Sequence, residues 1–503
     1  MTPSTKPSSL GELKASGYRP KTVREELRAN LRRKLATGEP LFPGVLGYDR
    51  TVIPGIVNAI LAGHDLILLG LRGQAKTRLL RSLTDLLDPE IPVLAGSELN
   101  DDPIEPISVP GQKLVAELGD DAPVEWLSRE LRYNEKLATP DVSIADLLGD
   151  IDPIKAATQK LTFADPEVIH FGIVPRTNRG IFAVNELPDL APRIQVGLLN
   201  LLEERDLQIR GFPVRIPLDI MLVFSANPED YTNRGSIITP LKDRISSQIL
   251  THYPADPEVA AQITAQEAWT DRGHTEAQVV IPGLVKLMIE EIAFAARDSE
   301  LVDQSSGVSA RMSISALELL WSNLERRALA TGDHPVYPRV CDLHMLLPAI
   351  TGKVEMVYEG EQQGAEVVAK KLIGEAVKNV FVDRLPDVPK GIGSGGEEDR
   401  GRYADIVRWF AEGGMVTVTD EIPFGDYYRE LQQVPHLMDL AKEHAPSEDD
   451  AVVAFTAELI LEGLHQHLKL AREDLDSHIT YKEMMKFQLL RPNRPSRGDR
   501  GVN

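Results

Sequence analysis

Apolar and polar residues are arranged along the first half of the chain in a pattern that predicts strands and helices in turn. Short continuous apolar runs predict buried strands at residues 66–69, 180–184 and 219–225. Longer stretches with helical spacing predict helices at residues 52–62, 77–87 and 192–205. Strands that alternate with helices favour a parallel sheet covered by helices on both faces. We therefore expect an α/β domain over residues 45–255.

The segments around this domain follow other patterns. Residues 1–20 are polar and predict a disordered leader. Residues 21–44 contain an amphipathic helix whose apolar stripe is formed by Val23, Leu27, Leu31 and Leu35. Within the α/β domain, residues 99–175 are rich in Asp, Pro and Glu and predict an insertion.

The second half of the chain is mainly helical, because strand signals fade after residue 255. Residues 256–384 predict an all-α domain that follows the α/β domain as a lid. Residues 385–402, with many Gly and Pro, predict a flexible linker. Residues 403–490 predict a small, mainly helical C-terminal domain, and residues 491–503 predict a disordered tail.

Composition and charge limit the classes of partner and the cellular location that we expect for this chain. The chain has 503 residues, of which 42% are hydrophobic and 26% charged, as in ordinary globular proteins. Its net charge of −21 argues against general nucleic-acid binding, because an acidic surface repels phosphate. The N-terminus lacks an apolar signal segment, and no apolar run approaches the ~20 residues of a membrane span. We expect a cytoplasmic protein without a membrane span.

A glycine-rich segment between a predicted strand and a predicted helix carries the first candidate chemistry. Such a loop directs backbone N–H groups toward phosphate oxygens at a helix N-terminus. The expected nucleotide contacts are Gly70, Arg72, Gly73, Gln74, Ala75, Lys76, Thr77 and Arg78. Lys76 would reach the β- and γ-phosphates and Thr77 would hold Mg²⁺, so we expect ATP and Mg²⁺ as cofactors.

One residue departs from the phosphate-loop pattern G-x-x-x-x-G-K-[ST], because Ala75 replaces the last glycine. The added methyl group could cost some affinity for phosphate. We expect residue 75 to begin a helix, where alanine is well tolerated. Nucleotide binding is therefore expected to survive.

Two later strands also end in polar residues. The strand at 180–184 is followed by Asn185 and Glu186. Glu186 would polarise the attacking water as a general base. Asn185 would support Mg²⁺ with a carbonyl oxygen instead of a carboxylate, which predicts looser metal binding. Asn227 follows the strand at 219–225 and would hydrogen-bond the γ-phosphate or the attacking water.

Two arginines complete the candidate site. Arg244 would reach the γ-phosphate of a neighbouring subunit as an arginine finger. Arg311 opens a helix of the second half and would fold back onto the nucleotide. Taken alone, each has a plainer explanation: a surface salt bridge for Arg244 and an ordinary helix start for Arg311.

In order, these segments resemble AAA+ ATPases of the branch that holds MoxR-type ATPases and the I subunit of magnesium chelatase. The matching segments are 47–49, 70–77, 185–188, 195–204, 207–217, 225–228, 241–244 and 309–311. The resemblance implies the roles of Walker A for 70–77, Walker B for Asn185 and Glu186, sensor 1 for Asn227, arginine finger for Arg244 and sensor 2 for Arg311. It also implies an α/β P-loop core, a homo-oligomeric ring that is usually hexameric, and a partner with a von Willebrand factor A domain.

Three functions remain open at this point. The first is an ATP-hydrolysing motor, slowed by Asn185, that remodels or matures a partner protein or a metal-dependent complex. The second is a true magnesium chelatase subunit that drives Mg²⁺ insertion into a porphyrin. The third is a scaffold that ATP switches without hydrolysis. The acidic composition and the lack of a helix-turn-helix signal count against a DNA-associated AAA+ protein.

Overall fold

The structure is a computed structural model. It describes residues 6–152, 154, 155, 158, 168–208, 215–227, 236–273, 278–389, 401–475 and 478–484. It divides into two compact units, Met1–Tyr253 and Pro254–Asn503, which are described separately. Among the described residues, none of the helices combines the length and the apolar character needed to cross a membrane.

Unit 1 (Met1–Tyr253) is built on a five-stranded sheet with the order β11-β1-β10-β7-β4. Every neighbouring pair in this sheet is parallel. Its strands are β1 (Leu66–Leu69), β4 (Tyr133–Leu137), β7 (Gly180–Asn185), β10 (Ile220–Ala226) and β11 (Ser247–Leu250). Residues of β1, β7 and β10 are buried throughout, as continuous apolar runs predict for a sheet covered on both faces. The predicted parallel α/β core is confirmed.

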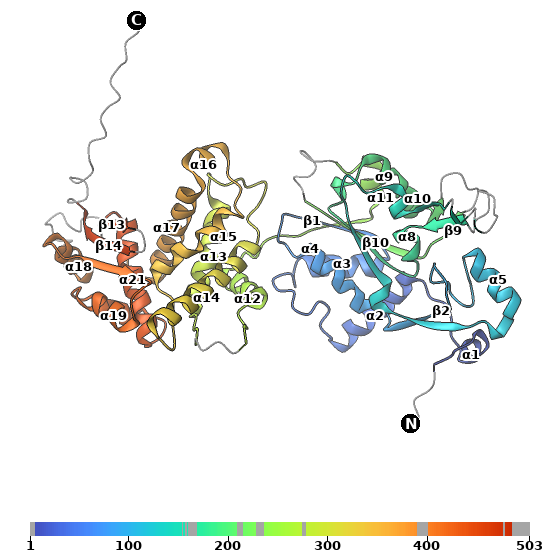
Figure 1. The fold of residues 1–503 in the computed structure, drawn as a ribbon, viewed down its shortest axis with the longest axis horizontal. Coiled ribbons are helices and arrows are strands. Elements are labelled where there is room, and N and C mark those ends of the chain that lie inside the picture. The colour runs from blue at the N-terminus through green and yellow to red at the C-terminus, as the bar shows by residue number, and fades with distance from the viewer. Residues whose placement is uncertain are drawn as a thin grey trace, which may run out of the picture. The chain divides into compact units, whose positions relative to one another are not determined.

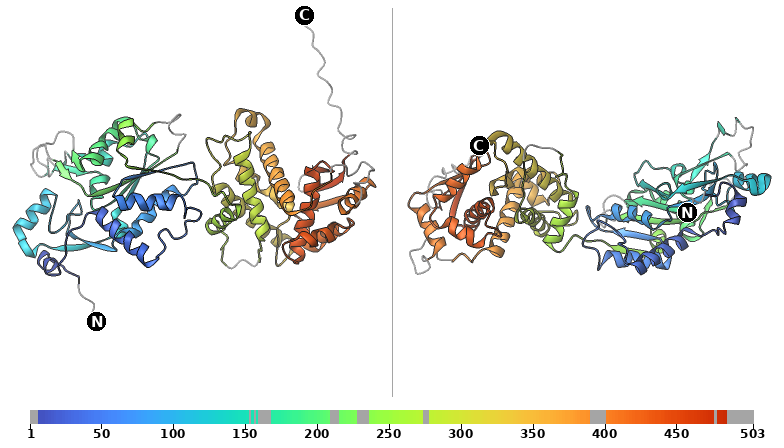
Figure 2. Two further views of the ribbon diagram at one scale, coloured as in Figure 1. Left: turned by 180° about the vertical axis from the view of Figure 1, so that it is seen from behind. Right: turned by 90° about the horizontal axis from the view of Figure 1, so that it is seen from below.

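Helices cover both faces of this sheet (Figures 1 and 2). One face packs against α2 (Val23–Thr37), α3 (Val52–Ala62) and α4 (Lys76–Ser82), the last continued by a 3-10 turn, η1 (Leu83–Leu86). The other face packs against α8 (Ile173–Arg176), α9 (Pro192–Gly197), α10 (Leu199–Glu203) and α11 (Thr239–Arg244). Alternate residues of β1, β7 and β10 enter the two apolar clusters, as strand geometry requires.

The predicted insertion at residues 99–175 needs correction, because β4 lies inside it and belongs to the central sheet. The other elements of this region, and β2 just before it, form small additions outside that sheet. They are β2 (Glu90–Leu94), α5 (Val109–Leu118), η2 (Gly119–Asp121), β3 (Val124–Ser128), η3 (Arg129–Arg132), α6 (Ile144–Leu147), β5 (Gly149–Ile151) and β6 (Ile169–Phe171). The strands β2 and β3 pair antiparallel, as do β5 and β6.

The disordered leader predicted for residues 1–20 is also wrong for residues 6–20. Ser9 caps a short helix, α1 (Leu10–Ala15), with its side-chain oxygen. Leu10 and Leu13 are buried on this helix, and Leu10 packs with Leu94 and Ala122. Burial of apolar side chains therefore stabilises an ordered structure in a segment whose composition predicted disorder.

The predicted N-terminal helix is α2, and polar contacts hold it against the domain. Glu26 forms a buried ion pair with Arg132, with an N–O distance of 2.6 Å. Arg24, which the sequence places on a face away from the apolar stripe, pairs with the buried Asp65 at 2.8 Å. These contacts join the start of the chain to the sheet that carries the candidate site.

The segment at residues 207–217, which resembles a β-hairpin of the AAA+ branch, has its two ends in the described part of the chain. These ends, β8 (Asp206–Gln208) and β9 (Arg215–Pro217), pair antiparallel. The turn between them lies outside the described residues.

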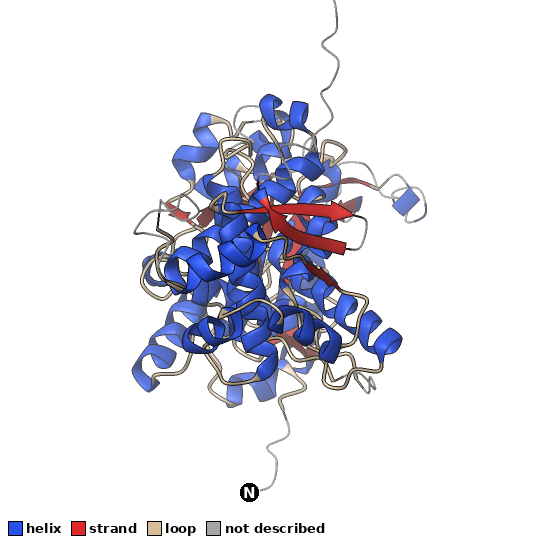
Figure 3. Ribbon diagram, turned by 90° about the vertical axis from the view of Figure 1, so that its left-hand side faces the viewer, coloured by secondary structure: helices blue, strands red, loops and turns tan. Residues whose placement is uncertain are grey.

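Unit 2 (Pro254–Asn503) is mainly helical. Its helices are α12 (Pro257–Glu267), α13 (Gly283–Asp298), α14 (Arg311–Thr331), η7 (Val340–Leu346), α15 (Leu347–Thr351), α16 (Tyr358–Gln363), α17 (Ala365–Arg384), α18 (Arg402–Ala411), α19 (Phe424–Gln432), α20 (Leu437–His444) and α21 (Asp450–Gln466). Figure 3 shows these helices in blue and a small antiparallel sheet in red. That sheet has the order β12-β14-β13 and consists of β12 (Val416–Thr419), β13 (Leu470–Leu475) and β14 (His478–Glu483).

One apolar core runs through the whole described part of unit 2. The cluster extends from Ala268 to Tyr481 and includes residues of both the predicted lid and the predicted C-terminal domain. The division between these two domains therefore stays a prediction, and packing does not mark it. The central part of the predicted linker, residues 390–400, and the predicted tail lie outside the described residues.

Candidate functional site

The carboxyl ends of the parallel strands meet at one edge of the unit 1 sheet, and ligands bind at this edge in open α/β sheets. The glycine-rich loop follows β1 there and leads into α4. Asn185 ends β7 and Asn227 follows β10, the strand next to β1. The fold therefore brings the loop, Asn185, Glu186 and Asn227 to the same edge of the sheet.

The loop is packed tightly at its first residue, Gly70. A Cβ atom at this position would lie 2.0 Å from Thr251 Oγ1 and 2.1 Å from Gln74 Oε1. Only glycine fits there without displacing these two groups, which are themselves joined by a hydrogen bond of 2.7 Å. The close fit holds the start of the loop against the end of β11.

Two tyrosines hold the loop backbone. Tyr48 donates its hydroxyl to Gln74 O at 3.0 Å, and Tyr253 donates to Arg72 O at 2.7 Å. Burial raises the pKa of Tyr48 to about 12, so its hydroxyl remains a donor at neutral pH. No local motif marks Tyr253, because its partner lies 181 residues earlier in the chain.

Lys76 lies inside the loop and is 6% exposed. Its Nζ donates to Gly70 O, to Leu71 O at 3.0 Å and to Asn227 Oδ1 at 2.6 Å. The predicted phosphate ligand and the predicted sensor thus touch each other directly. This cluster of carbonyl and amide oxygens holds a buried ammonium group in the centre of the loop.

Ala75 does not begin a helix in the way the sequence suggested. It caps α4 in the left-handed region, with φ +55° and ψ +16°. Gly73 in the same loop also has a positive φ of 74°. The left-handed region costs a non-glycine residue about 1–2 kcal/mol, so the expectation of a helical alanine without penalty was wrong.

Asn185 and Glu186 meet at Ser225 on the neighbouring strand. Ser225 Oγ donates to Asn185 Oδ1 at 3.1 Å and accepts from the backbone N–H of Glu186 at 3.3 Å. Glu186 adopts φ +55°, a conformation that few non-glycine residues adopt. Such backbone strain is typical of functional positions, where it fixes the direction of a side chain.

A carboxylate that was not predicted from the sequence, Glu135, lies next to Asn185. Glu135 lies on β4, within the predicted insertion; its pKa is lowered mainly by Arg81, and the Asn185 side chain contributes to the same shift. Glu135 also pairs with Arg81 of α4. Sequence spacing gives no signal for this contact, because it depends on the pairing of β4 with β7.

The two predicted arginines do not join this cluster within unit 1. The Arg244 guanidinium forms an ion pair with Glu203 of α10 at 2.7 Å and donates to Pro240 O at 3.1 Å. Arg311 lies in unit 2, where it is the first residue of α14 and exposed. Their roles as arginine finger and sensor 2 stay predictions.

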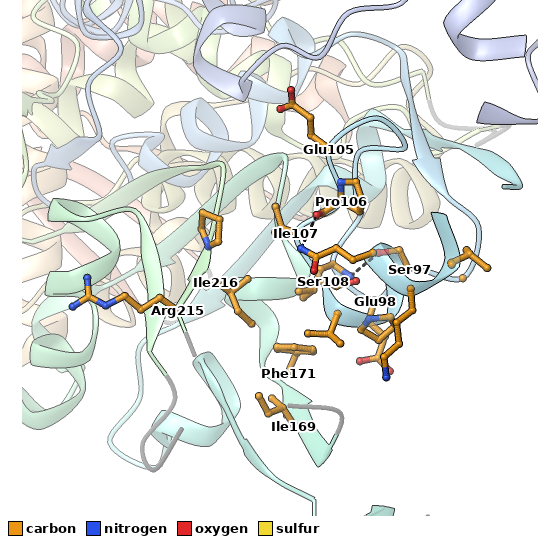
Figure 4. A pocket seen from close by; sticks show the side chains of 18 of the residues that line it. Ser97, Glu98, Glu105, Pro106, Ile107, Ser108, Ile169, Phe171, Arg215 and Ile216 are labelled. Carbon is orange, nitrogen blue, oxygen red and sulfur yellow. Dashed lines mark hydrogen bonds between the residues drawn. The ribbon is translucent and has the colours of Figure 1, made fainter. Parts of the chain in front are cut away.

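A cavity of about 920 Å³ opens elsewhere in unit 1. Its walls come from the segment before and within α5, from β6 and from β9, and include Ser108, Phe171 and Ile216 (Figure 4). None of the phosphate-loop residues lines it. The candidate nucleotide site is therefore marked by convergent polar groups and not by cavity volume.

Comparisons with known proteins find relatives of about half of this chain. No protein-family model matches the chain. Magnesium-chelatase subunit ChlI of Nostoc sp. strain PCC 7120 is 27% identical over 237 residues, which are 46% of this chain and 59% of the relative. The chloroplastic magnesium-chelatase subunit ChlI of Oryza sativa subsp. indica is 28% identical over 258 residues, or 50% of this chain and 58% of the relative. The chain thus spans little more than half the length of these relatives.

Among solved structures, a model of the complex between subunits BchI and BchD of magnesium chelatase aligns with 64% of this chain and 98% of its own chain, at 18% identity. The TM-score of this alignment is 0.34. The curated relatives are compatible with the parallel sheet and with the glycine-rich loop that follows β1. Over about half of its length the chain is similar to I subunits of magnesium chelatase, the branch that its sequence motifs resemble.

Proposed function

We propose that this chain binds and hydrolyses ATP as the subunit of a ring-forming motor that remodels or matures a partner protein or a metal-dependent complex. The observation that carries the proposal is the direct contact between Lys76 Nζ and Asn227 Oδ1 at 2.6 Å. The expected phosphate-binding residue, Lys76, therefore contacts Asn227, which follows β10. Glu186 follows β7 at the same edge of the sheet. Hydrolysis needs these three functions together at one edge of the sheet.

The groups present fit a nucleotide phosphate. Gly70 leaves no space for a side chain beside the loop, which allows close backbone approach. Lys76 would exchange its carbonyl partners for phosphate oxygens, and Arg72, Gly73, Gln74, Ala75, Thr77 and Arg78 would complete the phosphate contacts.

The groups present also fit Mg²⁺. Thr77 Oγ1 and Asn185 Oδ1 are oxygen donors, the kind of ligand that Mg²⁺ prefers. When bound, Mg²⁺ would neutralise negative charge on the phosphates during transfer. Glu186 would accept the proton of the attacking water, and Asn227 would orient that water or the γ-phosphate.

The quaternary part of the proposal rests on family resemblance. Arg244 would act on a nucleotide held by a neighbouring subunit, in a ring that is usually hexameric in this family. Its ion pair with Glu203 would then have to open on assembly. A partner with a von Willebrand factor A domain is the expected companion, and Arg311 would contact the nucleotide from unit 2.

The proposal is tested with purified full-length protein and three single variants. Wild type should bind ATP and release phosphate in the presence of Mg²⁺. Glu186→Gln should keep nucleotide binding and lose about 100-fold or more of the turnover, because it removes the general base. Lys76→Met should lose binding itself. Glu117→Gln on the exposed face of α5 is the matched control and should behave as wild type.

Each failure has its own meaning. Wild-type protein that does not bind ATP would overturn the proposal. Binding without Mg²⁺-dependent turnover, unaffected by Glu186→Gln, would instead favour the ATP-switched scaffold. Ring assembly would then be the same with ATP and with a non-hydrolysable analogue.

A true magnesium chelatase subunit is the second candidate, because the curated relatives carry that name. It requires that the chain replace the I subunit in a reconstituted magnesium chelatase. Mg²⁺ insertion into a porphyrin, measured by absorbance, would favour this candidate over the general motor.

A further inference from the structure

Three polar side chains lie in a row across adjacent strands at the ligand-binding edge of the sheet. Glu135 comes from β4, Asn185 from β7 and Ser225 from β10. Glu135 pairs with Ala183, and Asn185 lies two residues beyond Ala183 on the same strand. Because strand side chains alternate between faces, Glu135 and Asn185 point to the same side of the sheet. That side is covered by α4, the helix that follows the phosphate loop.

Asn185 makes a different contact with each neighbour. Its Oδ1 accepts from Ser225 Oγ at 3.1 Å. Glu135 and Asn185 are neighbours on adjacent strands, and a carboxylate has no hydrogen to donate, so only the Asn185 amide N–H can donate a hydrogen bond between the two side chains. Aspartate at position 185 could not make this bond and would place two carboxylates side by side. Asn185 and Glu135 are therefore a matched pair.

Glu135 is itself held in place by two donors. Arg81 Nε lies 3.0 Å from its Oε2, and the Tyr133 hydroxyl lies 3.1 Å from the same atom. Arg81 also contacts the other carboxylate oxygen, Oε1, so the two side chains form an ion pair with two contacts. Arg81 lies four residues after Thr77, one turn further along α4. The Glu135 carboxylate is thus held beside Asn185, the position where the family resemblance leads us to expect a carboxylate.

We propose that Glu135 is a positioning residue of the nucleotide site, which fixes the Asn185 amide and supplies, from the neighbouring strand, the negative charge that Asn185 lacks. This inference rests on the proposed function and deepens it. A carboxylate near Mg²⁺ strengthens metal binding by its charge. In this chain the carboxylate lies on β4 and not on β7, and asparagine at position 185 is the residue type that accommodates it.

The test is a double-variant cycle with Glu135→Gln, Asn185→Asp and the combination of both. The first readout is the thermal unfolding midpoint of the full chain without nucleotide. The second is the Mg²⁺ concentration that gives half-maximal binding of a fluorescent, non-hydrolysable ATP analogue. Glu125→Gln on β3, an exposed residue, is the matched control and should leave both readouts at the wild-type value.

We expect coupling in both readouts. Asn185→Asp alone should lower the unfolding midpoint by about 3–6 °C, because two carboxylates then face each other. Glu135→Gln alone should raise the required Mg²⁺ concentration about tenfold. The double variant carries one carboxylate again, at position 185, and should return both readouts close to wild type.

The outcomes separate the inference from the proposed function. Additive effects of the two substitutions, in a protein that binds the nucleotide analogue, would overturn the inference alone. A Mg²⁺ requirement that Glu135→Gln leaves unchanged would also overturn it. Wild-type protein that binds no analogue at any Mg²⁺ concentration would overturn both.

Discussion

At the scale of single residues, the predicted phosphate loop contains one residue, Ala75, in an unfavourable backbone conformation. Ala75 occupies the left-handed region, where its methyl group crowds the backbone. Glycine would adopt this conformation freely but would also lose more chain entropy on folding. The first effect is the larger one, so residue 75 stores a small strain beside the predicted phosphate site.

This strain predicts that Ala75→Gly stabilises the protein, by about 0.5 kcal/mol in the free energy of unfolding. Ala29→Gly is the matched control, because Ala29 is exposed in the middle of α2. There the same substitution should cost about 1 kcal/mol of helix stability. Urea denaturation measures both changes. Equal losses in the two variants would mean that residue 75 does not hold a left-handed conformation in solution.

The residues of the site were predictable to different degrees. Asn185, Glu186 and Asn227 lie at the ends of strand-like apolar runs, and Lys76 follows the loop after a third run, so a parallel sheet brings them to one edge. Contacts of Tyr253 and Glu135 depend on chain segments far apart in sequence, and local spacing cannot reveal them. The left-handed φ of Ala75 likewise follows from the closed loop rather than from residue type.

At the scale of elements, the sequence missed β4 for a physical reason. Tyr133–Leu137 is an edge strand with no fully buried residue, so it lacks the apolar run that marks β1, β7 and β10. A similar limit applies within residues 403–490, which were expected to be mainly helical. The helix α21 ends at Gln466, and β13 then pairs with β14. Both strands are recognised only through their partners.

Close helix packing in unit 2 depends on a glycine of α21. A Cβ atom at Gly463 would lie 1.9 Å from Cδ2 of Phe381 on α17, and Phe381 is itself buried. Gly463→Ala should therefore destabilise unit 2 by about 1–3 kcal/mol, despite the better helix propensity of alanine. Calorimetry of the full chain measures the change.

Two further variants make this prediction specific to the helix contact. Gly425→Ala on α19 adds a methyl group where no atom lies within 4 Å, and it should be neutral or stabilising. Combining Gly463→Ala with Phe381→Leu should recover part of the loss, because the smaller side chain gives space. A Gly463→Ala protein as stable as Gly425→Ala would contradict the close approach.

At the scale of the whole molecule, a buried carboxylate ties the predicted lid to the predicted C-terminal domain. Glu458 of α21 accepts hydrogen bonds from the backbone N–H groups of Val340 and Cys341, each at 2.8 Å. It also accepts one from the Tyr427 hydroxyl at 2.6 Å. The two parts of unit 2 thus share a polar contact inside one apolar core, which favours cooperative unfolding.

This contact predicts a pH dependence of stability. Burial raises the pKa of Glu458 from 4.5 to about 7, because it disfavours the charged form. Below pH 4.5 the carboxyl is protonated in both the folded and the unfolded chain. Between pH 4.5 and 7 the folded chain keeps a proton that the unfolded chain releases, so the stability from this group is lost as the pH rises.

Glu458→Gln removes the titration and retains the size of the side chain. Its free energy of unfolding should fall less between pH 5 and 7.5 than that of wild type, by about 1–3 kcal/mol. Urea denaturation across this range measures the difference, with the exposed Glu412→Gln as a control that follows wild type. The three donors around Glu458 favour its charged form and oppose the effect of burial. A difference between wild type and Glu458→Gln that stays constant with pH would mean that these donors prevail and that the carboxylate is already ionised at pH 5.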